Sequence, residues 1–346
     1  MKLAILFGGA SFEHEISIVS AITVMKKLQK DFELEFIFCD NNHNFYLVPQ
    51  DKMKAKTFSN YEYKKFPKLS LKNGAFISNK LFSKIEIDAT ILNLIHGSDG
   101  EDGTIASLLD FYGIKYIGPR VDASIFSYDK RYTKWLCEAK NIKYVKYETL
   151  FSNESKDITL DYPVIVKPAR LGSSIGVSIV RDVDELDYAL DVAYEYDNVV
   201  LVESFIEGVK EYNLAGYIAN GEMHYSIVEE PQKQDFLDFE KKYMDFSRDE
   251  EVQKAQISDE LVTKLKSNFK IIYQDMFEGS LIRCDFFVIN DEVYLNEINP
   301  IPGSMANYLF EDFSKAINDL ALSLPMRKRA KVNYEYIHKI SKAKGK

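Results

Sequence analysis

The stretch Ser280–Pro302, SLIRCDFFVINDEVYLNEINPIP, decides the fold that we expect for this chain. Two apolar segments flank the polar turn Asn290-Asp291-Glu292, a pattern that predicts a β-hairpin. Four polar residues interrupt the apolar segments at alternate positions: Arg283, Asp285, Glu297 and Asn299. Because strand side chains alternate between two faces, the first two share a face, and so do the last two.

The register of this hairpin determines whether the polar side chains meet. A turn of three residues would set Asp285 opposite Glu297. The same register places Arg283 opposite Asn299. Like charges opposite each other on a sheet repel, and a hard divalent cation such as Mg²⁺ would relieve that repulsion. The alternative is a solvated hairpin face with scattered charges.

The composition limits the classes of protein to which this chain can belong. The 346 residues suggest two or three domains, and 46% hydrophobic residues are enough for real cores. A net charge of −9 argues against nonspecific nucleic-acid binding. No apolar run is long enough to span a bilayer. Three widely separated cysteines form neither a disulfide framework nor a zinc-binding spacing, so we expect a cytoplasmic protein.

The first 118 residues are typical of an open parallel sheet. Lys2–Phe7 and Glu33–Cys39 are expected strands, joined by a glycine-containing loop and a helix over Ile16–Leu28. Ala89–Ile95 is another buried strand, and three glycines follow it in His96–Gly103. The segment Asn41–Leu81 is rich in Lys and Asn and shows less regularity. We place the first domain boundary at residue 118.

The rest of the chain alternates strands and helices. The pattern predicts strands at Pro163–Lys167, Val177–Val180, Asn198–Glu203, Leu214–Ala219 and Glu222–Val228, and helices at Asp122–Asn141, Asp182–Glu195 and Glu260–Met276. Asn220-Gly221 is a strong turn signal. The charged segment Glu229–Ser258 is a long loop, which in a compact protein is usually functional or disordered. Residues 326–346 carry eight Lys/Arg and one Glu, which predicts either a tail that binds a partner or RNA, or a solvated terminal helix or frayed end.

One loop could bind phosphate. Lys167–Val177, KPARLGSSIGV, lies between two expected strands, and glycines there would let backbone N–H groups and serine hydroxyls meet phosphate oxygens. It lacks the Walker A spacing, and an ordinary hairpin turn is an equal alternative. For five single residues, a bland solvated or strand-capping role competes with a binding role: Lys167, Glu203, Glu211, His96 and Lys130.

Together these motifs resemble the D-alanine–D-alanine ligases of the ATP-grasp superfamily. The matching segments follow the family's order over about residues 3–310: Gly8–Ser17, His96–Thr104, Lys167–Gly176, Phe239–Tyr243, Arg283–Asp285 and Asn296–Gly303. The resemblance implies a mixed α/β and α+β fold, with an N-terminal open parallel α/β domain and two α+β subdomains that sandwich ATP. The implied domains are residues 1–118, 119–202, 203–325 with a mobile lid at 229–258, and a basic tail at 326–346.

The resemblance also implies roles for individual residues. Glu13 would hold the ammonium of the first D-alanine and be linked through Ser173 to Tyr243 on the lid. Arg283 and the Gly303 amide would steady the tetrahedral oxyanion. Substrate contacts would come from His96, Ser304, Tyr308 and Leu309. Nucleotide contacts would come from Lys130, Lys167, Ser174, Glu203, Phe205, Ile206, Glu211 and Lys242. Two Mg²⁺ or Mn²⁺ ions would be bound by Asp285, Glu297 and Asn299.

Two departures from the family pattern concern the second substrate and the lid. Tyr308 stands where the family has a serine that binds the second substrate's carboxylate, so Ser304 or backbone groups would have to replace it. The lid ends in Gln253-Lys254-Ala255-Gln256 and lacks the usual Pro-Ala.

The implied reaction uses ATP to phosphorylate one D-alanine, and the amine of a second D-alanine then attacks the acyl phosphate. We expect D-alanine as the small-molecule partner, no nucleic-acid or membrane partner, and a homodimer. Two rival functions remain. One is a D-alanine–D-lactate ligase or another ATP-grasp carboxylate ligase, and the other is a non-catalytic nucleotide sensor on the same fold.

Overall fold

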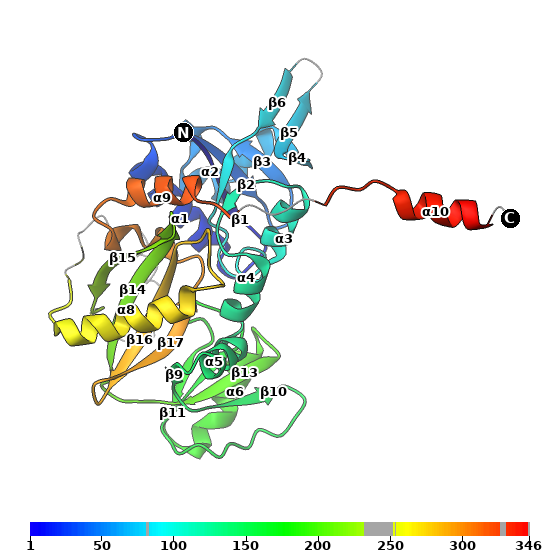
Figure 1. Cartoon of the computed structure of the whole chain (residues 1–346). Coiled ribbons are helices and arrows are strands. Elements are labelled where there is room, and N and C mark those ends of the chain that lie inside the picture. Colours follow the sequence, from blue (N-terminus) through cyan, green and yellow to red (C-terminus); the bar gives the residue numbers. More distant parts are fainter. Residues whose placement is uncertain (81–82, 232–251, 253, 326–329, 345–346) are drawn as a thin grey trace.

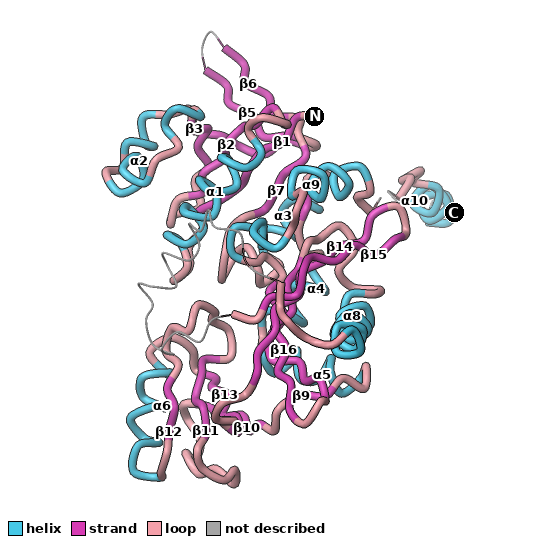
Figure 2. The backbone as a smooth tube through the Cα atoms, turned by 90° about the vertical axis from the view of Figure 1, so that its left-hand side faces the viewer, coloured by secondary structure: helices cyan, strands magenta, loops and turns pink. Residues whose placement is uncertain are grey.

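The computed structural model describes residues 1–80, 83–231, 252, 254–325 and 330–344. Three sheets organise these residues (Figure 1). Their strand orders are β6-β5-β4-β3-β2-β1-β7-β8, β10-β13-β11-β12 and β15-β14-β16-β17-β9. Figure 2 shows the third sheet between the first, above it, and the second, below it. No helix in the described part of the chain combines the length and the apolar character needed to cross a bilayer.

The first sheet has the expected parallel centre. Its parallel strands are β1 (Lys2–Gly8), β2 (Glu33–Cys39), β7 (Thr90–Asn93) and β8 (Tyr116–Ile117). Side chains of β1 alternate between two apolar clusters, one against α1 (His14–Leu28) and α9 (Phe313–Leu322) and one against α3 (Thr104–Phe111). Helices on both faces bury the strand from Leu3 onward, which is typical of parallel sheets.

The segment expected to be less regular forms most of the antiparallel edge. It contains β3 (Phe45–Val48), α2 (Ala55–Ser59), β4 (Lys68–Lys72) and β5 (Ala75–Lys80), with single 3₁₀ turns at Gln50–Lys52 and Glu62–Lys65, and β6 (Ser83–Ile87) follows. These strands are short and carry exposed lysines, so their apolar alternation is weak. An edge with such strands resists pairing with other chains.

The apolar face of the second sheet packs against a single helix. It contains β10 (Tyr147–Phe151), β11 (Val164–Pro168), β12 (Ser178–Val180) and β13 (Val199–Ser204). Valines of β11 and β13 pack on α6 (Leu186–Tyr194), which follows a 3₁₀ turn at Val183–Glu185. Because side chains alternate, Lys167 and Glu203 project from the opposite face. The single helix expected at Asp122–Asn141 is two helices, α4 (Val121–Tyr128) and α5 (Lys130–Ala139), separated by Asp129, whose side chain accepts a hydrogen bond from the Arg131 amide.

The third sheet follows the same plan. It contains β9 (Lys143–Tyr144), β14 (Lys210–Ala219), β15 (Glu222–Glu229), β16 (Ile282–Ile289) and β17 (Glu292–Asn299). Cys284 and Phe286 pack in the cluster formed with α8 (Asp259–Tyr273). Arg283 and Asp285 therefore lie on the face away from α8. The hairpin predicted over Asn220-Gly221 is confirmed.

The hairpin of β16 and β17 has the predicted residue pairs but not the predicted turn. Asp285 pairs with Glu297, and Arg283 with Asn299, as expected. The three-residue turn is wrong, because Ile289 pairs with Glu292 and only Asn290-Asp291 form the turn. A bulge between Asp285 and Phe286 shifts the register by one residue and restores the predicted pairs.

Two further elements complete the chain. The 3₁₀ segment Gly303–Leu309 follows the hairpin and contacts α1, and α10 (Glu335–Lys344) projects away from the rest of the molecule (Figure 1). The expected domain boundaries after residues 118, 202 and 325 stay a prediction. We note that β9, from the second expected unit, pairs with β17 of the third sheet.

Candidate active site

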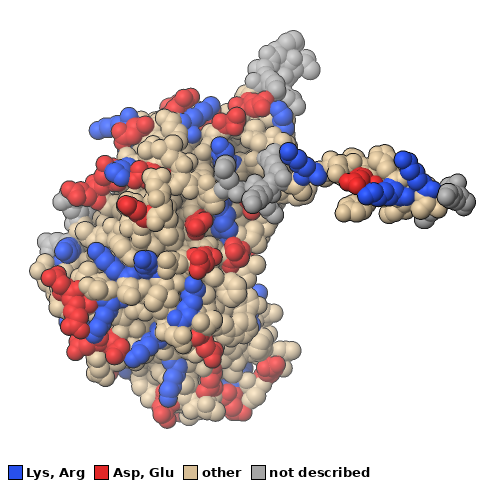
Figure 3. Space-filling view, in the orientation of Figure 1, with Lys and Arg blue, Asp and Glu red and all other residues tan. Residues whose placement is uncertain are grey.

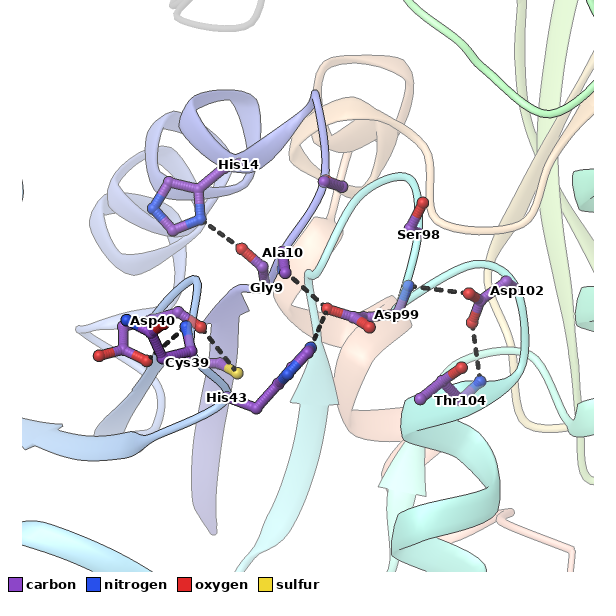
Figure 4. A network of polar contacts seen from close by, with 12 residues as sticks. Gly9, Ala10, His14, Cys39, Asp40, His43, Ser98, Asp99, Asp102 and Thr104 are labelled. Atoms are coloured by element: carbon purple, nitrogen blue, oxygen red, sulfur yellow. Dashed lines mark hydrogen bonds and ion pairs between the residues drawn. The ribbon is translucent and has the colours of Figure 1, made fainter. Parts of the chain in front are cut away.

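The loops after β1 and β7 meet at the carboxyl ends of the parallel strands (Figure 4). The Asp99 carboxylate accepts a hydrogen bond from the Ala10 amide at 2.7 Å and lies 3.0 Å from His43 Nε2. The Asp99 amide in turn donates to Asp102. A cavity of about 320 Å³ opens beside this network, lined by Gly9, Ala10, Ser11, Phe12, His14, Asn41 and Ser98. The carboxyl edge of an open α/β sheet is the usual place for a ligand.

Glu13 lies next to these loops and is almost fully buried. Its Oε1 accepts a hydrogen bond of 2.6 Å from the Ser173 hydroxyl, which belongs to the loop between β11 and β12. A side chain at Gly97 would bring its Cβ within 2.8 Å of the Glu13 carboxylate, and one at Gly172 within 3.0 Å. Burial, and then the nearby Glu101 carboxylate, raise the pKa of Glu13 to about 7. The predicted link between Glu13 and Ser173 is therefore present.

His96 is buried between Ser20 and Glu101. Its Nε2 lies 2.9 Å from the Ser20 hydroxyl, and its Nδ1 lies 3.5 Å from Glu101. Burial lowers the pKa of His96 to about 4, so the imidazole is neutral at pH 7. The pKa of Glu101 is raised to about 8 by burial and by Glu297. This pair provides hydrogen-bonding groups without a full ionic charge.

Ser20 also positions the segment after the hairpin. Its hydroxyl accepts a hydrogen bond from the Ser304 amide at 3.0 Å. Ser304, Met305 and Ala306 all have left-handed backbone angles, with φ of 48°, 55° and 48°. Such angles are unfavourable for residues other than glycine, and they persist only where the surroundings hold them.

Lys130 connects the second sheet to the hairpin. It is the first residue of α5 and is only partly exposed, whereas spacing alone favoured a surface position. Its ammonium donates to the Leu171 carbonyl at 2.6 Å and lies 3.3 Å from Glu297. Burial opposes ionisation of Glu297, but Lys130 and Lys167 outweigh it and lower the pKa of that carboxyl.

Glu203 joins two buried lysines. Lys134 Nζ lies 2.8 Å from one carboxylate oxygen, and Lys167 Nζ lies 2.6 Å from the other. All three side chains are buried, so the expectation that Glu203 and Lys167 taken singly are solvated is wrong. Burial opposes ionisation of Glu203, but the two ammonium groups lower its pKa to about 2. Lys134 of α5 meets Lys167 and Glu203 on the face of the second sheet away from α6, so the cluster carries one net positive charge, which favours an anionic ligand.

The hairpin presents an arginine and a carboxylate to the same space. Arg283 donates two hydrogen bonds to Asp285, at 2.7 and 2.8 Å, and a third to the Tyr308 hydroxyl at 3.1 Å. Asn299 Nδ2 donates to Asp285 at 3.0 Å. Burial opposes the charge on Arg283, but the Asp285 carboxylate raises its pKa.

The hairpin patch fits a divalent cation by the chemistry of its donors. Asp285 and Glu297 are directly paired across the strands, and Asn299 adds an amide oxygen. No group of three His, Cys, Asp or Glu side chains with metal-binding geometry occurs in the part of the chain that the structure describes. The cations Arg283 and Lys130 hold the two carboxylates. A metal ion would take over that charge compensation and leave the arginine available for a substrate oxygen.

The remaining predicted residues divide into two groups. The first group lies in the part of the chain that the structure describes: Ser174, Phe205, Ile206, Glu211, Gly303, Ser304, Tyr308 and Leu309. Ser174 is in the loop beside Ser173, Phe205 follows β13 with its amide bonded to the Pro163 carbonyl, and Glu211 is on β14 opposite Phe287. Lys242 and Tyr243 lie outside the described residues, as does most of the expected lid.

Three residues of this network were missed by sequence reasoning. Glu101 was visible only as part of a glycine-rich motif, without a role. Ser20 is a polar residue on the apolar face of α1, and Lys134 follows Lys130 by one helical turn. A polar residue on a buried helix face is a usable signal, because buried polar groups are normally hydrogen-bonded.

Comparisons with known proteins identify the family of this chain. The family model described as D-ala D-ala ligase N-terminus matches residues 2–119, and the one described as D-ala D-ala ligase C-terminus matches residues 121–317. A D-alanine–D-alanine ligase of Sulfurimonas denitrificans is 66% identical over the full length of both chains, and one of Wolinella succinogenes is 55% identical, again over both full lengths.

Solved structures give the same result. The D-alanine–D-alanine ligase of Helicobacter pylori superposes with a TM-score of 0.84 at 47% identity, covering 95% of this chain and all of that one. A D-Ala:D-Ser ligase of Enterococcus faecalis, 24% identical, shares the fold with a TM-score of 0.74 over 93% of this chain and 97% of that one. The buried network joining three sheets and the full-length matches lead to one conclusion. This chain belongs to the D-alanine–D-alanine ligase family.

Proposed function

We propose that this protein joins two D-alanine molecules into D-alanyl-D-alanine, with ATP as the energy source, for peptidoglycan precursor synthesis. The observation that carries this proposal is the buried network of Glu13, Lys130, Glu297 and Arg283. Its carboxylate is suited to an ammonium, its lysine to phosphates and its arginine to an oxyanion, and the contacts of these side chains support the proposal. The full-length identity to D-alanine–D-alanine ligases supports the same assignment.

In the first step, the carboxylate of one D-alanine attacks the γ-phosphorus of ATP and displaces ADP. Glu13 holds the ammonium of this D-alanine, and His96 lies near its carboxylate. Lys130 and Lys167, with Lys242 of the lid, compensate the charge on the phosphates, while Ser174, Glu203, Phe205, Ile206 and Glu211 surround the nucleotide. Phosphoryl transfer depends mainly on such positioning and charge compensation. The product is an acyl phosphate, which has a good leaving group.

In the second step, the neutral amine of another D-alanine attacks the carbonyl carbon of the acyl phosphate. The tetrahedral oxyanion forms beside Arg283 and the Gly303 amide, and its collapse expels phosphate. Donors fixed at the developing charge lower the barrier to this step. Ser304, Tyr308 and Leu309 surround the second substrate, and the Arg283–Tyr308 hydrogen bond supports this arrangement.

We propose that Asp285, Glu297 and Asn299 hold two Mg²⁺ or Mn²⁺ ions. Such ions supply charge neutralisation on the phosphate oxygens when bound. We also propose that Tyr243, linked through Ser173 to Glu13, closes the lid over the first substrate. Excluding water protects the acyl phosphate from hydrolysis.

The test is ADP release by the purified protein with ATP and Mg²⁺. We expect rapid release with D-alanine, and little with L-alanine or with no substrate. Mass spectrometry of the product distinguishes D-alanyl-D-alanine from the depsipeptide when D-alanine and D-lactate compete, and from the mixed dipeptide when D-serine competes. A predominant depsipeptide would make the protein a D-alanine–D-lactate ligase. ATP binding without ADP release under any condition would make it a nucleotide sensor.

We further propose that the protein works in the cytoplasm, where ATP is available, and as a homodimer.

A further inference from the structure

One carboxylate connects the loops that follow the parallel strands β1, β2 and β7 at their carboxyl ends (Figure 4). Asp99, in the loop after β7, accepts a hydrogen bond of 2.7 Å from the Ala10 amide of the loop after β1. The same carboxylate oxygen lies 3.0 Å from Nε2 of His43, in the turn after β2. The proposed reaction assigns no role to Asp99, although Asp99 bonds the loop that carries Glu13.

The burial of Asp99 makes its hydrogen bonds more important than contacts at the surface. Exposed charges of both signs are interspersed over the face of the molecule that Figure 3 shows, where solvent screens them. Asp99, by contrast, is only 9% exposed. Buried polar groups are normally hydrogen-bonded, and removing one partner leaves the other unsatisfied. We therefore expect the bond between Asp99 and the Ala10 amide to hold the loop after β1 in one position.

The backbone of Asp99 is held by the start of α3. Its φ is 71°, in the left-handed region that favours glycine. Its amide donates to Asp102 Oδ2, and Asp102 Oδ1 accepts a hydrogen bond from the amide of Thr104, the first residue of α3. Residues in such conformations persist only where their surroundings hold them, and they cluster at functional sites. The start of α3 thus fixes the backbone from which the Asp99 carboxylate projects.

The turn after β2 fixes the second partner of Asp99. The Asp40 carboxylate accepts hydrogen bonds of 2.9 Å from the backbone amides of Asn42 and Asn44, on either side of His43. The Asp40 carbonyl accepts a third from the His43 amide. This turn therefore orients the His43 ring toward Asp99, although 58% of the His43 side chain is exposed. Because solvent weakens exposed contacts, we expect His43 to contribute less than the backbone bond.

The position of Ala10 determines where Glu13 lies. The hydroxyl of Ser11, the next residue, donates to the His96 carbonyl at 2.7 Å and accepts a hydrogen bond from the Glu13 amide at 3.1 Å. Glu13 is then the N-cap residue of α1. The amide that Asp99 holds is only three positions before Glu13 in the chain. A shift of the loop at Ala10 would therefore move the Glu13 carboxylate.

We propose that Asp99 is a positioning residue for the first-substrate site. It holds the loop after β1 so that the Glu13 carboxylate meets the ammonium of the first D-alanine, and this inference rests on the proposed function of Glu13. Because Asp99 acts by geometry, its neutral isostere should serve almost as well. An asparagine side chain keeps an oxygen that can accept the hydrogen bond from the Ala10 amide. Removing the side chain should weaken binding of the first D-alanine alone, since a small displacement of a positioning group has a large effect at a reacting site.

The test compares Asp99→Gly with Asp99→Asn in the full-length protein. Glycine removes the carboxylate and adopts the left-handed backbone without strain. Initial rates over a wide range of D-alanine concentrations give a KM for each of the two D-alanine sites. For Asp99→Gly we expect the KM of the first site to rise about tenfold, as for one lost hydrogen bond to a charged group, and the KM of the second site and the KM for ATP to change by less than about twofold. Asp99→Asn should keep all three values close to those of the unchanged protein.

A matched control and a second readout separate positioning from general damage. Asp275→Gly is the control, because Asp275 is also an aspartate with a left-handed backbone, φ 65°, and is exposed in the loop after α8. It should change none of the three KM values. Hydrogen exchange measured by mass spectrometry does not depend on the reaction. The amides of residues 10–13 should exchange faster in Asp99→Gly than in the unchanged protein, and at the unchanged rate in Asp99→Asn.

An unchanged first-site KM in Asp99→Gly, or unchanged exchange of residues 10–13, would overturn the proposal. A rise by the same factor in all three KM values would also overturn it, because that is the effect of general damage. So would a defect in Asp99→Asn as large as that in Asp99→Gly, which would assign the effect to charge rather than to position. If the unchanged protein did not ligate D-alanine, the proposed function would be wrong, whereas the exchange rates would still decide whether Asp99 holds the loop.

Discussion

At the scale of the residue, the buried carboxyl of Glu13 couples stability to pH. Its pKa of about 7 in the folded protein exceeds the ordinary value of 4.5. Below the ordinary value both states are protonated and no penalty exists. Between the two values the unfolded chain releases its proton first, so the folded protein loses stability as the pH rises, by about 3 kcal/mol in full above pH 7.

We therefore predict that Glu13→Gln stabilises the protein more at pH 8 than at pH 5. The gain in the free energy of unfolding should be about 3 kcal/mol at pH 8 and about 1 kcal/mol at pH 5, measured by denaturant unfolding. Glu207→Gln, at an exposed position, is the control and should change neither value. An equal gain for Glu13→Gln at both pH values would show that Glu13 does not carry this coupling.

The two lysines that pair with Glu203 allow a structural role to be distinguished from a nucleotide-binding role. Lys134 and Lys167 each pair with one oxygen of the same buried carboxylate. We predict that Lys134→Met and Lys167→Met each destabilise the protein by about 3 kcal/mol, because each leaves the buried Glu203 charge less compensated. The KM for ATP should rise much more for Lys167→Met, since only Lys167 is proposed to reach a phosphate. Equal increases in the KM for ATP would remove that distinction.

The sequence showed that Glu203 and the two lysines are charged, but it could not predict that their side chains are buried. The apolar run ending at Glu203 indicated a strand, yet nothing in it showed that two lysines from other elements would meet the carboxylate. Charged residues are usually exposed unless paired, and the partners Lys134 and Lys167 are 69 and 36 positions away in the sequence. Pairing at that separation is a property of the fold.

At the scale of the element, the hairpin of β16 and β17 shows how the predicted pairing of Asp285 with Glu297 could be correct although the predicted turn length was wrong. The alternation of polar residues predicted which side chains share a face within β16 and within β17, and a three-residue turn then set Asp285 opposite Glu297. The protein instead uses the two-residue turn Asn290-Asp291, with φ of 51° and 62°, and inserts a bulge. Two left-handed residues are typical of the turns that match the twist of a hairpin. A bulge has no sequence signature as clear as that of a turn.

This turn predicts a stabilising substitution. Asp291→Gly should raise the free energy of unfolding by about 1 kcal/mol, because glycine adopts the left-handed conformation without the penalty that a Cβ imposes. The hydrogen bond from Lys264 to the carbonyl of residue 291 does not need the side chain. Glu292→Gly, one residue later in the strand, is the control and should lower the stability. A loss of stability in both variants, measured by thermal and denaturant unfolding, would contradict the turn assignment.

At the scale of the whole molecule, the site exists only because three sheets converge. The motifs were visible one at a time, and their order along the chain matched a known family. The sequence did not show that these motifs lie close together in space, because residues such as Glu13 and Ser173 are 160 positions apart. Neither strand periodicity nor helix spacing carries information over that range. The resemblance supplied the arrangement that local patterns could not.

The bond between Glu13 and Ser173 ties the first sheet to the second, and it predicts a change in the pH dependence of the reaction. The Ser173 hydroxyl favours the charged form of Glu13, so Ser173→Ala should raise the pKa of that carboxyl above its present value of about 7. A hydrogen bond to a charged group is worth about 1.5–3 kcal/mol, which corresponds to a shift of about 1 pH unit or more. Because an ionised Glu13 is proposed to hold the ammonium of the first D-alanine, the acid limb of kcat/KM for that substrate should move to higher pH by this amount. Ser98→Ala is the matched control, since its hydroxyl bonds Tyr128 near the same site and does not contact Glu13. If the bond served only to hold the two sheets together, Ser173→Ala would lower kcat/KM by the same factor at every pH, and the limb would stay in place.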